Sequence, residues 1–239
     1  TAGSPGTNTA SVLLISGMSG SADDVSLARH ALESIQADSA AHGNHIRLSA
    51  IPDCNPDGQR DLSTGYPPTG EFFYNAEEPE KRYLWRWISF QAPTLILELR
   101  SGEAVSWQGN KAGSNLASAL AGSGGLVENG SLLTALGSGS PDGLGPIPGL
   151  RLTSPPESLD DELGKLWKVL SDQPGLSEAS PARQVLEARS ARSYLQVAHI
   201  LASVYGYQLD PVNYTQGVGI SGRLQLYELS KTGESPASG

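Results

Sequence analysis

The 239-residue sequence has few of the residues that build cross-links and metal centres. It contains one cysteine, Cys54, so no disulfide can form within the chain. Zinc sites made of four cysteines, or of two cysteines and two histidines, are excluded for the same reason. Of the four histidines, His42 and His45 fall at an expected helix-to-strand turn, and His30 and His199 lie in helical stretches without a second ligand one turn away. We therefore expect no histidine-based metal site.

Positive charge is also scarce. Lys and Arg number 16 against 25 Asp and Glu, a net charge of −9. This balance argues against nucleic acid and anionic membranes as partners, because both are bound by basic patches. No apolar run approaches the roughly 20 residues that a membrane helix needs, so no span is predicted. A soluble protein is expected, either cytoplasmic or secreted after removal of a leader, and the oligomeric state stays open.

The apolar residues that are present predict one α/β domain with a mixed, mostly parallel sheet flanked by helices. We expect a flexible lead-in over 1–10, the domain over 11–229 and a flexible tail over 230–239. A buried strand at 12–16, a helix from about 24 to 40 and a strand at 45–51 form a β-α-β unit, which favours a parallel pair. The later elements expected are helices at 78–90, 158–170 and 181–205, short helical patches at 116–121 and 131–136, and strands at 93–103, 147–152 and 222–229.

Two of these strand ends carry motifs. The first strand runs into Gly17-Met18-Ser19-Gly20-Ser21-Ala22, and the second ends near Pro52-Asp53-Cys54-Asn55-Pro56-Asp57-Gly58. Together they resemble the zinc carboxypeptidase family, including its succinylglutamate-desuccinylase-like relatives. That family has a Gly-x-His-Gly-x-Glu type loop followed by a Pro-x-x-Asn-Pro-Asp-Gly segment. The resemblance implies the same fold and a zinc-dependent hydrolase as the family activity.

The same resemblance puts Ser19, Ala22 and Arg100 at the positions of the three zinc ligands. Neutral serine is a poor ligand, alanine has no donor atom, and a protonated arginine has no lone pair for a metal. We therefore predict that the zinc cofactor is lost and that the chain binds no metal. The family's late glutamate, a general base, would correspond to Glu228 at the end of the last expected strand, which is a weak catalytic candidate.

An arginine at a former metal position attracts anions. With the strand order that the resemblance implies, Arg100 would converge with Glu98, Glu103, Asp57 and Arg60. We expect it to pair with a carboxylate there. The aromatic residues Trp107, Tyr66–Pro68 and Phe72–Tyr74 are candidates for the rim of a shallow cleft. As nucleophiles, Ser19 lacks an evident base and Cys54 lacks a positive setting, so packing roles are expected for both.

The preferred interpretation is a non-catalytic zinc-carboxypeptidase-like protein whose cleft binds a peptide end or a small anion. One alternative is an active metallocarboxypeptidase or amide hydrolase with unrecognised zinc ligands. Another is a structural or interaction module. Metal content separates the active hydrolase from the other two.

Overall fold

The structure is a computed structural model that describes residues 10–37, 46–58, 60–68, 79–122, 124–139, 143–172, 179–204 and 214–232. The chain folds into two compact units, one ending at Leu186 and the other beginning at Glu187. All of the strands in the described residues lie in the first unit, and the second contains helices. The domain limits expected from the sequence, 11–229, stay a prediction.

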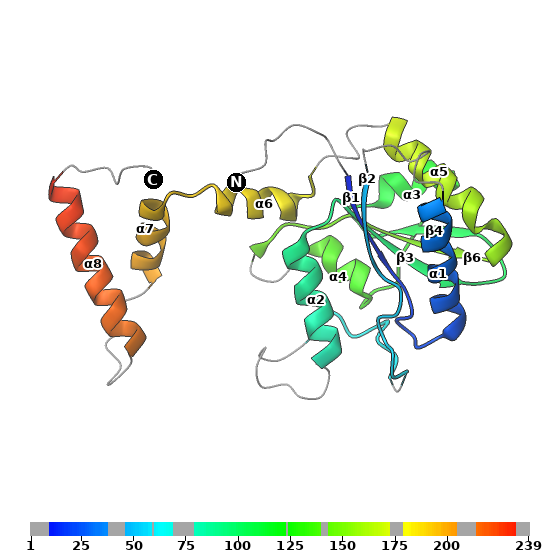
Figure 1. Cartoon of the computed structure of the whole chain (residues 1–239), viewed down its shortest axis with the longest axis horizontal. Coiled ribbons are helices and arrows are strands. Elements are labelled where there is room, and N and C mark those ends of the chain that lie inside the picture. Colours follow the sequence, from blue (N-terminus) through cyan, green and yellow to red (C-terminus); the bar gives the residue numbers. More distant parts are fainter. Residues whose placement is uncertain are drawn as a thin grey trace. The chain divides into compact units, whose positions relative to one another are not determined.

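The first unit is built on a six-stranded sheet with the order β2-β1-β3-β6-β4-β5. The pairs β1–β2, β1–β3, β3–β6 and β4–β5 are parallel, and β4–β6 is antiparallel. The predicted mixed, mostly parallel sheet flanked by helices is therefore confirmed (Figure 1). The strands are β1 Ala10–Ile15, β2 Ile46–Ile51, β3 Leu95–Ser101, β4 Ser106–Gly109, β5 Gly125–Leu126 and β6 Gly149–Ser154.

Helices cover both faces of this sheet, as expected for buried parallel strands. Apolar side chains of α1 (Ala22–Ala37), α3 (Ser114–Ala121) and α5 (Leu159–Asp172) share one core with Leu95, Leu97 and Leu99 of β3. The other face packs against α2 (Pro79–Gln91), α4 (Leu132–Ser138) and the start of α6 (Pro181–Ser190), with Ile96 of β3 in that core. A short 3-10 helix, Pro156–Ser158, precedes α5.

Helix α2 turns a different face inward from the one its sequence suggests. The spacing of the apolar residues predicts Tyr83, Leu84, Trp87 and Ile88 as the apolar face and leaves Trp85 off it. The structure buries Trp85, whose ring centroid lies 6.4 Å from that of Tyr66, and exposes Tyr83 and Trp87. Ile88 of the predicted face is buried, but the places of the three aromatic residues were predicted wrongly, because closely spaced aromatic residues give a helix two competing apolar stripes.

A single helix was predicted at 181–205, and this prediction is wrong. The structure has two helices there, α6 and α7 (Tyr194–Val204). The break has a local cause at Ser193 and Gln196. The backbone N–H of Ser193 donates to Gln196 Oε1 at 2.8 Å, and the N–H of Gln196 donates to Ser193 Oγ at 3.3 Å. This reciprocal pair is a capping box, which starts a new helix at this point.

The predicted strand at 222–229 is also wrong, because these residues lie inside α8 (Tyr214–Thr232). Side chains one turn apart interact along this helix: Lys231 Nζ lies 4.1 Å from the ring centroid of Tyr227 and 3.5 Å from Glu228 Oε1. A strand would need a neighbouring strand for its backbone hydrogen bonds, whereas a helix supplies its own. Within the described residues, none of the helices is both long enough and apolar enough to cross a membrane.

Candidate functional site

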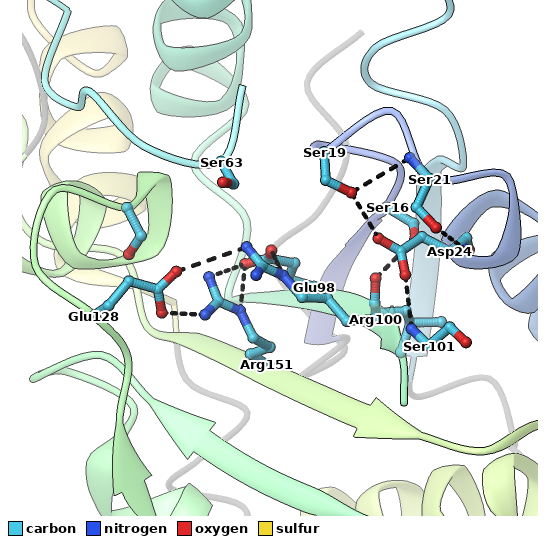
Figure 2. Close-up of polar contacts among 12 residues, drawn as sticks. Ser16, Ser19, Ser21, Asp24, Ser63, Glu98, Arg100, Ser101, Glu128 and Arg151 are labelled. Atoms are coloured by element: carbon cyan, nitrogen blue, oxygen red, sulfur yellow. Dashed lines mark hydrogen bonds and ion pairs between the residues drawn. The ribbon is translucent and has the colours of Figure 1, made fainter. Parts of the chain in front are cut away.

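A network of four charged side chains lies on the α2/α4 face of the sheet. Side chains alternate between the two faces of a strand, so Glu98 and Arg100 of β3 point away from the core that holds Leu97 and Leu99. Arg151 of β6 is the register partner of Glu98. The fourth member, Glu128, comes from the loop before α4, and Figure 2 shows it reaching toward both arginines.

Buried Glu98 joins the two arginines. Its Oε1 accepts from Arg100 Nε at 2.8 Å, and its Oε2 accepts from Arg151 Nε at 3.1 Å and Nη2 at 3.0 Å (Figure 2). Glu128 Oε2 accepts from Arg151 Nη1, while Glu128 Oε1 lies 3.7 Å from Arg100 Nη2. The pairing of Arg100 with a carboxylate is therefore present, and two positive charges face two negative ones.

The electrostatics of the network favour the ionised forms of Glu128 and Arg151. Burial raises the pKa of Glu128, but the hydrogen bond from Arg151 and the charges of Arg151 and Arg100 outweigh it, so this pKa lies below its usual value. Burial lowers the pKa of Arg151, and the charge of Glu98 with the hydrogen bonds to both carboxylates more than reverses the effect. Buried charges are stable only when paired in this way.

A second cluster joins the loop after β1 to the end of β3 through Asp24, near the start of α1. Asp24 Oδ2 accepts from Ser19 Oγ at 3.2 Å, and Asp24 Oδ1 accepts from the backbone N–H of Ser101 at 2.8 Å. Ser16 Oγ lies 2.9 Å from the Asp24 carbonyl oxygen and 2.7 Å from that of Leu99, and its single proton can go to either. Asp24 thus links three segments of the chain, of which the end of β3 is distant in sequence (Figure 2).

The two motif loops that carry the resemblance lie against one another. Asn55 Nδ2 donates to the carbonyl oxygens of Met18, at 3.2 Å, and Arg60. Gly20 and Gly58 both have positive φ, and a Cβ on Gly20 would lie only 3.0 Å from the Cα of Gly58. Any larger side chain at Gly20 would force these loops apart, so glycine is required there.

The residues at the three implied ligand positions do not fit zinc. Ser19 is exposed and donates its hydroxyl to Asp24, Ala22 is exposed and has no donor atom, and Arg100 is a cation in ion pairs with glutamates. A catalytic zinc needs three donor side chains and an open position. Within the described parts of the chain, no group of three or more His, Cys, Asp or Glu side chains is arranged to hold a metal ion.

Several other predicted site residues lie outside the network. Glu103, Asp57 and Arg60 are exposed, and their convergence on Arg100 stays a prediction. Glu228 was expected at a strand end, but it lies on α8 in the second unit, paired with Lys231. The candidates His42, His45 and Phe72–Tyr74 lie outside the described residues.

Trp107 and Cys54 have packing roles. Trp107 was expected at a cleft rim, but it is buried and its Nε1 donates to Glu162 Oε2 at 2.7 Å; the short strand β4 carries it into the core. Burial raises the pKa of the Cys54 thiol to about 12, with smaller contributions from the charges of Glu98 and Asp53. A thiol with so high a pKa forms almost no thiolate at neutral pH and is a poor nucleophile.

Three residues of these clusters were not identified from the sequence. The sequence marks Asp24 as a residue that suits the start of a helix, although its position directly after the first motif loop is also a usable signal. Arg151, inside an apolar strand, also carried a signal, because a charge at such a position requires a partner. Glu128 gave none, since it lies in a Gly-rich loop between distant elements.

These observations define an α/β protein with a mostly parallel sheet and two polar clusters. One lies on β3, β6 and the loop before α4, and the other joins the loop after β1 to the end of β3. No family model matches the chain, and a search of the curated proteins finds no match. Among solved structures, a metallo-carboxypeptidase from Pseudomonas aeruginosa in complex with (2-guanidinoethylmercapto)succinic acid is similar, with 12% identity and a TM-score of 0.49. The match covers 72% of this chain and 59% of that one.

Two further solved structures, each described as a proposed metallopeptidase, are also similar. One, from Shewanella baltica, has 16% identity and a TM-score of 0.44, and the match covers 73% of this chain and 80% of that one. The other, from Shewanella denitrificans, has 13% identity and a TM-score of 0.45, and the match covers 74% and 77% of the two chains. The fold assignment of this chain rests on its own strand order and register.

Proposed function

We propose that this chain is a non-catalytic protein with a zinc-carboxypeptidase-like fold, and that Arg100 serves to bind a peptide end or another small anion. The observation that carries the proposal is the chemistry at the three implied ligand positions. A hydroxyl, a methyl group and a guanidinium stand there, and the guanidinium is held by two glutamates. A fixed positive charge repels a divalent cation and attracts an anion.

The polar surroundings of Arg100 support an anion rather than an apolar ligand. Its side chain is 27% exposed, so part of it reaches solvent while Glu98 fixes the Nε end. Arginine recognises carboxylates through hydrogen bonds of fixed geometry, which suits the terminal carboxylate of a peptide or an acyl-amino acid. The resemblance of the motif loops to those of carboxypeptidases favours the same ligand class.

Metal content tests the non-catalytic part. The full chain, incubated with zinc and then dialysed, is expected to retain far less than one zinc per chain by elemental analysis. It is also expected not to hydrolyse peptides or acyl-amino acids. Stoichiometric zinc together with hydrolysis that a chelator stops would instead establish an active hydrolase with other ligands.

A binding screen tests the anion part. N-acetyl amino acids and short peptides with carboxylate or amidated ends are titrated into the wild-type chain and the Arg100→Ala variant. Binding is expected only for the carboxylate forms, and it should weaken at least about tenfold in Arg100→Ala, a loss of about 1.4 kcal/mol. The matched control Arg47→Ala removes an equally charged residue from edge strand β2 and should bind normally. Identical affinities in all three proteins would leave a structural or interaction module.

A further inference from the structure

One hydrogen-bond donor in the charged network has no acceptor among the described residues. Arg100 Nη2 is buried, yet it donates no hydrogen bond to any residue in the described part of the chain. Its ion pair with Glu128 Oε1 spans 3.7 Å, beyond hydrogen-bond distance. A buried, charged N–H without an acceptor is energetically costly, so an additional oxygen at this position would stabilise the protein.

Glu98 cannot supply that oxygen. Its Oε1 is taken by Arg100 Nε and its Oε2 by Arg151 Nε and Nη2, at distances of 2.8, 3.1 and 3.0 Å. Its side chain is also buried, so it has no room to turn toward Nη2. Glu98 therefore holds a fixed position in the network and anchors the two arginines.

Glu128 differs from Glu98 in its exposure. Its side chain is 42% exposed and comes from a loop, while the Glu98 side chain projects from the sheet interior. An exposed carboxylate that turns outward regains water as its partner, so its displacement costs little compared with that of a buried one. Glu128 is the member of the network that an incoming anion can replace.

We infer that Glu128 is a built-in competitor for the anion site at Arg100, and that a ligand with a single carboxylate displaces it, placing one oxygen on Arg100 Nη2 and the other on Arg151 Nη1, the donor that Glu128 releases. This inference rests on the proposed function. The four side chains are neutral together, with two arginines and two glutamates. When Glu128 turns outward, the other three carry one positive charge, which a monoanion neutralises and a dianion overcompensates.

The test measures binding of N-acetylglycine to the full chain by calorimetry. In Glu128→Gln the competing charge is gone, and affinity is expected to rise about tenfold over wild type, equivalent to about 1.4 kcal/mol. The matched control Glu33→Gln removes the same charge from an exposed residue of α1, which packs on the opposite face of the sheet, and should bind like wild type. Arg100→Ala should not bind, and acetate should gain from Glu128→Gln more than inorganic phosphate does.

The outcomes separate this inference from the proposed function. Equal affinities of wild type and Glu128→Gln, with binding lost in Arg100→Ala, would refute the competition by Glu128 but support anion binding at Arg100. Absence of binding in wild type and in Glu128→Gln alike would overturn both. A larger gain for phosphate than for acetate would refute the monoanion preference. Because Glu128 also bonds Arg151, Glu128→Asp is a second variant: its shorter side chain keeps the charge but withdraws it, and it should also bind more tightly than wild type.

Discussion

The sheet unit and the C-terminal helices bury their apolar side chains to very different extents. In the sheet unit, side chains such as Leu97 and Leu150 are completely buried between strands and helices. In α7 and α8, none of the described residues is buried, and Tyr194 is 90% exposed. Tertiary packing therefore stabilises the first unit, whereas local devices such as the Ser193–Gln196 capping box define the helices of the second.

The largest effect that tests this contrast comes from equal truncations in the two regions. Leu150→Ala is expected to lower the free energy of unfolding by about 3 kcal/mol, because it leaves a cavity between the sheet and its helices. Leu201→Ala on α7, where the leucine is 50% exposed, should cost less than about 0.5 kcal/mol. Urea unfolding followed by circular dichroism measures both. Similar losses for the two variants would show that α7 is packed as tightly as the sheet.

Thiol reactivity is the next contrast. With a pKa of about 12, Cys54 should react with a thiol reagent at pH 8 roughly fifty-fold more slowly than an ordinary thiol, and its burial slows it further. A cysteine introduced by Ser203→Cys on exposed α7 provides the ordinary thiol in the same molecule. Peptide mapping of the labelled protein gives both rates. Comparable rates at the two positions would contradict the buried setting of Cys54.

Removing the charge of Asp24 in the sheet unit should change the free energy of unfolding less than the leucine truncation does. Asp24→Asn is expected to lower the free energy of unfolding by about 2 kcal/mol, because Asp24 accepts two hydrogen bonds through its charge. Asp23→Asn, which removes the neighbouring exposed charge from the same helix start, should cost about 0.5 kcal/mol. Hydrogen exchange adds a local readout, since the amide of Ser101 should exchange faster in Asp24→Asn alone. Unchanged protection of that amide would rule out the Asp24 link.

The smallest effect concerns pH. Because the folded pKa of Glu128 lies below its usual value of 4.5, its ion pairs stabilise the protein above that pH and are lost as the pH falls through the folded pKa. Glu128→Gln should therefore flatten the fall in unfolding free energy below pH 4.5, by less than about 1 kcal/mol since the group is partly solvated. Thermal melts between about pH 3 and 7 measure this. A slope that Glu128→Gln leaves unchanged would contradict the ionised network.

Apolar runs and periodic apolar spacing predicted most of the sheet unit. Closely spaced aromatic residues and a single charged residue in a loop did not predict their own positions. The strands around Leu14 and Leu97 were apparent because a short apolar run bounded by turn residues has few other interpretations. The face of α2 was not, since closely spaced aromatic residues permit two orientations and only packing against Tyr66 selects Trp85. The predicted pairing of Arg100 with a carboxylate is present, yet Glu128 had no signal, because its loop meets β3 and β6 only after the chain folds.

By itself, the sequence determined the class of fold and the residue types at the first motif loop and at the end of β3. Apolar periodicity is a local property, and so is the inability of Ser19, Ala22 and Arg100 to act as a zinc ligand set. Only the tertiary structure decided that residues 222–229 form a helix and that Glu98, Arg100, Glu128 and Arg151 pair. Strand pairing and ion pairing both depend on a partner distant in sequence, and that partner reaches its place only when the sheet assembles.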